Sequence, residues 1–177
     1  MSDGKNAKPE IEDVISKVLS GDEQKNALNF VAYLRENKLN PKWSAANAWT
    51  VSSKTFRVCF IRLHGAADYH NLEAGAWHIL PFIGEYEDTS LSDELKEIVW
   101  ANKKPCKTCG QCALQVSNIF GKKFDIACEG SILFLNPNSK EVECAKKLVE
   151  LRRHAIKEGM AKKHVYVAIK DRGGQNT

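Results

Sequence analysis

Four cysteines in one short segment constrain this 177-residue chain more than any other feature of its sequence. They follow the spacing C-x2-C-x2-C-x15-C and are Cys106, Cys109, Cys112 and Cys128. Two cysteines three residues apart and followed by glycine, as in Cys106 to Gly110, form a tight knuckle in which both thiolates face one ion. A second pair, Cys112 and Cys128, would complete a tetrahedral site. The sequence therefore predicts a four-cysteine metal site.

Zinc is the ion that this ligand set favours. A closed tetrathiolate leaves no open coordination position, so a zinc ion held by the four cysteines would organise the loop rather than catalyse a reaction. Three cysteines at successive x2 spacing are also typical of iron–sulfur ligand runs, although here the fourth cysteine is distant and no proline follows it. Redox-active C-x-x-C thiols and four free thiols are the remaining alternatives.

Length and composition predict one globular domain. The chain has 43% apolar and 27% charged residues, which is close to the average for folded proteins of this size. We expect a flexible segment at residues 1–8 and a disordered tail at 171–177. Between them we expect a single domain over residues 9–170, which contains the metal-binding segment 105–130.

The cysteines also bear on the expected compartment. No apolar run approaches the roughly 18 residues that cross a bilayer, and the first residues have no stretch typical of a signal peptide. We therefore expect a cytoplasmic protein with no membrane partner. In a reducing cytosol the six cysteines are not expected to form disulfides, which favours metal binding or redox chemistry for the clustered ones. Cys59 and Cys144 stand alone and are expected to be buried, unreactive side chains.

Apolar side chains at three- and four-residue spacing predict helices over residues 9–19, 20–39, 90–103 and 138–159. Two capping boxes are expected, one formed by Ser20 with Glu23 and one by Asn138 with Glu141. The helix expected over residues 90–103 begins at Ser90. Pro and Gly residues follow the expected helix ends.

Period-two patterns of aromatic and β-branched residues predict strands over residues 46–52, 56–64, 76–82, 131–135 and 165–169. The first three are expected to form an antiparallel meander with a tight turn at residues 52–54. The last is expected to be an edge strand. Together with the helices, this predicts an α+β fold with about four or five antiparallel strands packed against helices, and with a cysteine-rich metal loop.

Six aromatic side chains fall on or beside the predicted meander: Trp43, Trp49, Phe56, Phe60, Trp77 and Phe82. Core packing against the helices is one interpretation. The other is a concave sheet face that holds an apolar or aromatic small molecule, with polar side chains at its mouth that fix the orientation of the ligand. The ligand-binding residues predicted on this second interpretation are Trp49, Phe60, His64, Tyr69, Trp77 and His78.

Polar side chains also crowd around the loop at residues 65–75: His64, Asp68, His70, Glu73 and His78. Such groups can supply an acid–base pair or a second metal site. No spacing among them matches a known catalytic motif, and the chain has no nucleophile elbow or phosphate-binding loop. An enzyme centred on the three histidines is therefore the least favoured hypothesis.

Basic side chains predict a different kind of partner. Residues 140–177 hold ten Lys or Arg against five Asp or Glu, and lysines also flank the cysteines: Lys103, Lys104, Lys107, Lys122 and Lys123. The alternative hypothesis is thus a nucleic-acid or protein-interaction module that uses the metal loop and the basic last helix. Against it, Glu143, Glu150 and Glu158 alternate with the lysines of that helix, which is typical of a solvated face.

The order of helices and strands, with Trp49-Thr-Val-Ser-Ser and Val58-Cys-Phe-Ile in the meander, resembles several uncharacterised bacterial α+β domain families. Over about residues 22–157 the layout is also similar to YdhG-like and GyrI-like domains. This resemblance implies a groove between pseudo-repeats that binds small amphipathic molecules, although the chain shows no internal repeat. The leading hypothesis is therefore a cytoplasmic domain that binds or senses a small molecule, with a zinc knuckle between the third helix and the fourth strand.

Overall fold

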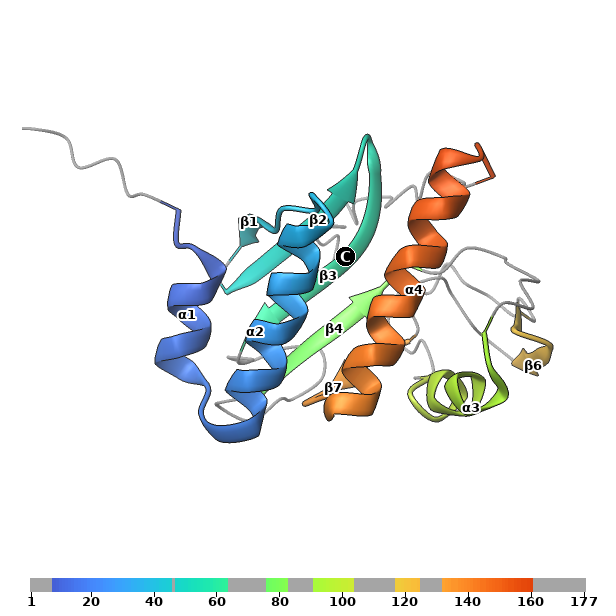
Figure 1. Ribbon diagram of the computed structural model, residues 1–177, viewed down its shortest axis with the longest axis horizontal. Helices are drawn as coiled ribbons and strands as arrows, with labels where there is room; N and C mark the ends of the chain where they lie inside the picture. The colour runs from blue at the N-terminus through green and yellow to red at the C-terminus, as the bar shows by residue number, and fades with distance from the viewer. Residues whose placement is uncertain are drawn as a thin grey trace, which may run out of the picture.

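The computed structural model describes residues 8–45, 47–63, 76–82, 91–103, 117–124 and 132–160. These residues form an α+β fold, as predicted (Figure 1). The helices are α1 (Ile11–Val18), α2 (Gly21–Glu36), α3 (Asp93–Ala101) and α4 (Ser139–Lys157). The strands are β1 (Lys42–Ala45), β2 (Ala48–Ser53), β3 (Phe56–Leu63), β4 (Trp77–Pro81), β5 (Ser117–Ile119), β6 (Lys122–Phe124) and β7 (Phe134–Leu135). No helix in these ranges combines the length and the apolar character needed to span a membrane.

One antiparallel sheet organises the fold, in the strand order β1-β2-β3-β4-β7. The predicted meander is confirmed, because β2, β3 and β4 pair in sequence with Trp49, Ile61 and Ile79 side by side. Strand β1 was not predicted, and it pairs with β2 through Trp43 opposite Trp49. The expected fourth strand is shorter than predicted, and as β7 it pairs with the free edge of β4. The strand predicted at 165–169 lies outside the described residues.

The hydrophobic core lies between the sheet and the helices. In Figure 1, α2 and α4 run across one face of the sheet, and α4 contacts both β3 and β4. Core side chains on the sheet include Trp49, Val51, Ile61, Leu63, Trp77, Ile79 and Phe134. Those on the helices include Ile15, Phe30, Leu34, Leu148 and Val149. Burial of large apolar side chains of this kind supplies most of the free energy that favours folding.

The helix ends agree with the sequence in part. The capping box at the start of α4 is confirmed: the Asn138 side chain accepts a hydrogen bond from the Glu141 N–H, and Glu141 accepts one from the Asn138 N–H. The capping box predicted at Ser20 is wrong, since the Ser20 side chain makes no capping hydrogen bond. The third helix begins after Ser92 rather than at Ser90. The Ser92 side chain accepts from the Leu95 N–H, and the preceding Leu91 is buried.

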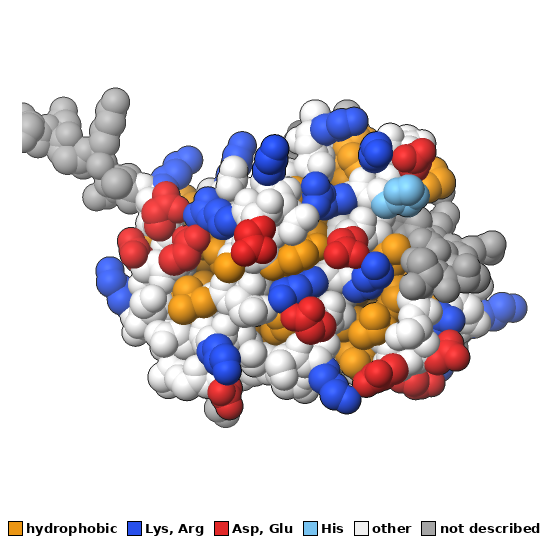
Figure 2. All heavy atoms as spheres, in the orientation of Figure 1, with side chains coloured by type: hydrophobic (Ala, Val, Ile, Leu, Met, Phe, Trp, Pro, Cys, Tyr) orange, Lys and Arg blue, Asp and Glu red, His pale blue; other side chains and the backbone are white. Residues whose placement is uncertain are grey.

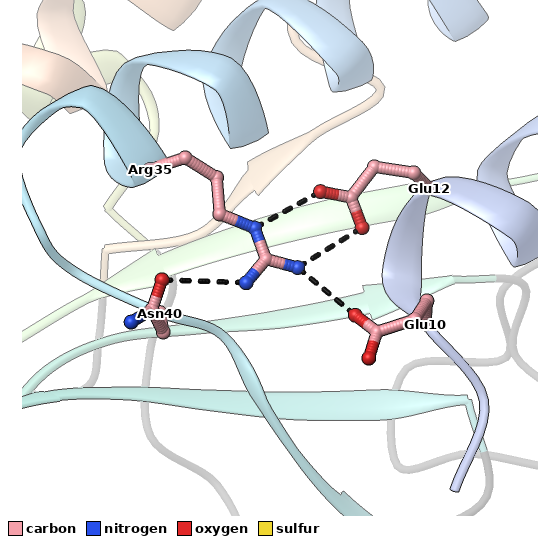
Figure 3. Close-up of polar contacts among 4 residues, drawn as sticks. All are labelled: Glu10, Glu12, Arg35 and Asn40. Atoms are coloured by element: carbon pink, nitrogen blue, oxygen red, sulfur yellow. Dashed lines mark hydrogen bonds and ion pairs between the residues drawn. The ribbon is translucent and has the colours of Figure 1, made fainter.

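A polar cluster joins α1 to the end of α2 (Figure 3). The Arg35 guanidinium donates to both carboxylate oxygens of Glu12, at 3.0 and 3.2 Å, and to Glu10 and Asn40. Burial alone would raise the pKa of Glu12, but the hydrogen bonds and charge of Arg35 lower it. Because these side chains are partly exposed, water screens the ion pairs and each contributes modestly to stability, on the order of 1 kcal/mol or less.

Candidate functional site

The predicted metal ligands all lie outside the residues that the structure describes: Cys106, Cys109, Cys112 and Cys128. Within the described ranges, no group of three or more His, Cys, Asp or Glu side chains could hold a metal ion. The structure does describe the chain on both sides of each cysteine segment. The geometry there decides whether the four thiols can meet.

A β-bridge closes the base of the cysteine-containing region. Lys103, just after α3, pairs antiparallel with Ile132, and the Leu133 N–H donates to the Asn102 carbonyl oxygen at 3.0 Å. Ile132 and Leu133 are buried, so this bridge is anchored in the interior. The two ends of the segment between residues 103 and 132 therefore lie side by side.

A two-stranded hairpin, β5 with β6, lies between the two cysteine segments. Ser117 pairs with Phe124 and Ile119 with Lys122, so the turn is the two-residue loop Phe120-Gly121. Both turn residues have positive φ, 48° and 87°, as a type I′ turn requires. A bulky side chain rarely adopts this conformation, and here Phe120 is buried in the hydrophobic core. The core thus holds the hairpin at its tip.

The end of α3 holds the same hairpin from the side. The Trp100 indole N–H donates to the Ile119 carbonyl oxygen at 2.8 Å. The Lys122 ammonium lies 4.9 Å from the centre of the Trp100 ring, and the Lys103 ammonium lies 4.9 Å from the centre of the Phe124 ring. Cation–π contacts of this kind are each worth about 0.5–1 kcal/mol at exposed sites. The hairpin is therefore fixed to α3 by a hydrogen bond and by two charged contacts.

The predicted ligand-binding residues divide between the two faces of the sheet. Trp49 and Trp77 lie on the helix-covered face, where they are 1% and 0% exposed and belong to the core. Phe60 and His78 lie on the opposite face, with ring centroids 6.5 Å apart. The structure therefore brings together Phe60 and His78 but places the two tryptophans on the other side. His64 and Tyr69 lie outside the described residues.

The face that carries Phe60 combines apolar and cationic side chains. Arg62 is the cross-strand neighbour of His78, and Leu80 is the cross-strand neighbour of Phe60. Leu135 of β7 lies on the far side of His78 and is 40% exposed. Because cross-strand neighbours share a face of the sheet, these side chains form one surface, which we call the second sheet face. Apolar side chains beside an arginine and a histidine can bind a molecule with an apolar body and a polar or anionic group.

Only one histidine of the loop cluster can be placed. His78 is 4% exposed and lies on β4, whereas Asp68, His70 and Glu73 lie outside the described residues, as His64 does. The convergence of histidines on which the enzyme hypothesis depends is therefore a prediction that the described residues do not test.

Trp77 combines full burial with an unsatisfied polar group. Its backbone N–H donates to the Asn136 side-chain oxygen at 2.8 Å, and its carbonyl accepts from the Asn136 N–H. The indole Nε1 is buried and has no hydrogen-bond partner among the described residues. A buried donor without an acceptor costs about 1–3 kcal/mol, which offsets part of the stabilisation that the buried ring supplies.

The two isolated cysteines are buried in the core, as predicted. Cys59 and Cys144 are each 0% exposed, and the Cys144 thiol lies 3.7 Å from the Leu95 carbonyl oxygen. Burial raises the pKa of Cys59 far above its ordinary value, and burial, with the charge of Glu141, raises the pKa of Cys144 to about 12. Both shifts favour the protonated thiol, which is a weaker nucleophile and metal ligand than the thiolate.

The sequence patterns did not identify three residues that make notable contacts in the structure. Arg62 alternates with Phe60 along β3, so the two side chains share a face, and this period could have identified it. Trp100 stands one turn before Lys103, which an aromatic–basic spacing could have indicated. Arg152 is 1% exposed and its Nε donates to the Arg57 carbonyl oxygen at 3.2 Å. No pattern in the sequence predicts a buried arginine on α4.

No family model, curated protein or solved structure matches this chain. The resemblance to GyrI-like domains therefore stays a prediction from the order of the elements.

Proposed function

We propose that this chain is a zinc-binding domain in which a four-cysteine site organises the region between α3 and β7, and that the second sheet face binds a small molecule. The observation that carries the proposal is the pair of antiparallel contacts around the cysteine segments, Lys103 with Ile132 and Ser117 with Phe124. Each contact brings together two chain segments that lead to cysteines. An iron–sulfur cluster on the same thiols is the alternative cofactor.

Chain length supports the meeting of all four thiols. Cys106 follows Lys103 by three residues and Cys128 precedes Ile132 by four, which limits them to about 11 and 14 Å from the bridge. On the hairpin side, Cys112 precedes β5 by five residues and Cys128 follows β6 by four. Paired Cα atoms lie only about 5 Å apart. The cysteines next to the bridge and those next to the hairpin are therefore within reach of one ion.

The proposed role of the ion is structural. Four thiolates would fill its tetrahedral coordination and leave no position for a substrate or an activated water. The hairpin is short, and two-stranded hairpins are marginally stable alone. An ion bound by cysteines before and after the hairpin would stabilise it further, in addition to the contacts of Phe120 and Trp100. A cytoplasmic location, which we also propose, would keep the thiols reduced.

The second sheet face is the proposed ligand site. Phe60 and Leu80 are partly exposed and lie outside the core cluster, although both are large apolar side chains. With Arg62 and His78 beside them, this surface suits a small apolar or aromatic molecule that carries a polar or anionic group. Because Trp49 and Trp77 belong to the core, they support the face from behind and do not contact the ligand.

Metal content tests the first part of the proposal. Native mass spectrometry and elemental analysis of protein purified without added metal should give one zinc per chain. Cys109→Ser should lose the ion, whereas Cys144→Ala, a matched removal of a buried thiol, should retain it. Iron with an equal amount of sulfide would replace zinc by a cluster, and protein without metal would refute the site.

Ligand binding tests the second part. A thermal-shift screen of small aromatic acids and amphipathic molecules should yield compounds that stabilise the chain, because a ligand that binds only the folded state raises its stability. Phe60→Ala should abolish the shift, whereas Leu28→Ala, a matched truncation of a half-buried side chain on α2, should preserve it. Shifts that survive Phe60→Ala would exclude this face as the site.

A further inference from the structure

Helix α4 carries six Lys or Arg and three Glu residues, and part of its positive charge is paired on the helix itself. Lys146 pairs with Glu143 at 2.6 Å and Lys147 with Glu150 at 2.8 Å, each one turn apart on the helix. Figure 2 shows acidic and basic side chains side by side over the middle of this face, and more basic than acidic side chains along its upper edge. Because these carboxylates lie beside the lysines, the middle of α4 is a less favourable surface for a polyanion than a group of lysines without acidic neighbours.

The hairpin and the end of α3 carry basic and aromatic side chains in one cluster. Lys122 lies over the rings of both Trp100, at 4.9 Å, and Phe124, at 5.6 Å, while Lys103 lies over Phe124 at 4.9 Å. Residues 100–103 and 117–124 contain lysines but no acidic residue. We call these four side chains, Trp100, Lys103, Lys122 and Phe124, the hairpin cluster. Lys123 adds charge from the opposite face of β6, since side chains alternate along a strand.

Two of the three acidic side chains of α3 are paired at the end of the helix that is far from the hairpin. Asp93 pairs with Lys96 and Glu94 pairs with Lys140, both at 3.0 Å. Both acids lie in the first turn of the helix, whereas Trp100 lies in its last turn. The hairpin cluster is therefore separated from these two paired carboxylates, while the third acid, Glu97, is exposed one turn before Trp100.

We propose that the hairpin cluster is a contact surface for single-stranded nucleic acid. Ammonium groups bind phosphates and release counterions, and aromatic rings beside them stack with bases; surfaces that bind single strands combine both. Lys103 and Lys122 meet the phosphates, and bases stack on the parts of the half-buried Trp100 and Phe124 rings that the ammonium groups do not cover. The proposal uses described residues alone and does not depend on a ligand of the second sheet face.

Fluorescence anisotropy with a labelled oligothymidine of about 20 nucleotides tests this surface on the full chain. Binding should be detectable at about 20 mM salt, and two phosphate contacts predict a slope of log K against log salt of about −1.4. Lys122→Glu should weaken binding at low salt by about tenfold or more, because it removes one contact and adds a repulsive charge. Lys122→Arg keeps the charge and the stacking and should bind as the parent does.

Two further variants locate the surface. Lys25→Glu, at an exposed position on α2, makes the same charge change elsewhere and should leave affinity nearly unchanged. Lys123→Glu should weaken binding less than Lys122→Glu. The proposal is overturned by an absence of binding at low salt, by equal losses in the Lys25 and Lys122 variants, or by equally tight binding of a duplex of the same length. Circular dichroism of each variant separates loss of contact from loss of folding.

Discussion

Trp77 shows how one residue can both stabilise the fold and carry an uncompensated cost. Its ring is fully buried among core side chains, but its indole N–H has no acceptor in the part of the chain that the structure describes. Trp77→Phe removes the unsatisfied donor and part of the buried area, so the two effects oppose each other and the change should cost within about 1.5 kcal/mol. Trp77→Ala should cost about 3–5 kcal/mol. Urea unfolding measures both, and equal losses would show that the indole N–H has a partner.

The buried thiol of Cys144 makes stability depend on alkaline pH. Burial raises its pKa from 9.0 to about 12 in the folded chain, so the unfolded chain loses its proton first as pH rises. The stability from this shift is present below pH 9 and is lost between pH 9 and pH 12. Cys144→Ala should reduce the fall of the unfolding free energy in this window by at most about 1.4 kcal/mol per pH unit. An unchanged slope in that variant would argue against the shift. Burial also raises the pKa of Tyr33 to about 12, so Tyr33 lowers the free energy of unfolding above pH 10. This effect is the same in the parent and in Cys144→Ala and does not change their difference.

At the scale of elements, the two predicted capping boxes provide a direct comparison. Asn138 caps α4 with its side chain, and Ser20 at the start of α2 does not. Asn138→Ala should therefore lower the free energy of unfolding by about 1 kcal/mol, whereas Ser20→Ala should leave it nearly unchanged. Thermal unfolding of the two variants measures the difference. A similar loss in both would show that Ser20 caps its helix in solution.

The β5–β6 hairpin offers a test of whether zinc affinity at the proposed site depends on the conformation of the hairpin. Gly121 has a φ of 87° and a Cβ there would meet no atom within 4 Å, so Gly121→Ala adds only backbone strain of about 1 kcal/mol. Gly159 after α4 has a φ of 74° and the same free space, so Gly159→Ala is a matched control. If the hairpin positions the cysteines, Gly121→Ala should weaken zinc binding about fivefold in a chelator competition and Gly159→Ala should not. Equal zinc affinities of the Gly121→Ala and Gly159→Ala variants would show that the hairpin does not position the cysteines.

What the sequence could predict at this scale follows from the strength of each local pattern. The meander was predictable because its strands are rich in aromatic and β-branched residues such as Trp49, Ile61 and Ile79, and the α4 cap because Asn138 and Glu141 have the required spacing. Strand β1 was missed because its four residues are too few to show a period, and only pairing with β2 defines it. The hairpin was missed because its turn places Phe120 at a positive φ, which a sequence pattern predicts for Gly or Asn instead.

For the candidate site, the limit of prediction was the sheet face. The sequence placed Trp49, Phe60, Trp77 and His78 near one another, but the register assigns the two tryptophans to the core and the other two to the second sheet face. Trp77 and His78 are consecutive on β4 and lie on opposite faces in any register, so this part of the division could have been predicted. The pairing of the three strands decides which side chains become cross-strand neighbours, and the sequence alone could not fix it. The aromatic residues clustered along this part of the chain therefore predicted the sheet, but they did not predict which of its faces could bind a ligand.

At the scale of the whole molecule, the main core is built from segments outside the cysteine region. Apart from Phe120 and Ile132, the core side chains belong to α1, α2, α3, α4, the central sheet and the residues next to these elements. A metal site between residues 103 and 132 should therefore stabilise the hairpin without being needed for the sheet. This distinguishes the chain from small zinc domains, which unfold altogether when the ion is removed.

Metal removal should accordingly act locally. After treatment with a chelator, backbone amides of β3 and β4, such as those of Ile61 and Ile79, should keep their protection from hydrogen exchange. Amides of the hairpin, such as that of Lys122, should lose protection, because opening of this unit would no longer have to break the metal site. Far-ultraviolet circular dichroism should change little, since α1, α2 and α4 pack against the sheet. Loss of protection throughout the sheet would mean that the ion holds the whole fold, and the hairpin would then be part of one cooperative unit with the core that Phe120 enters.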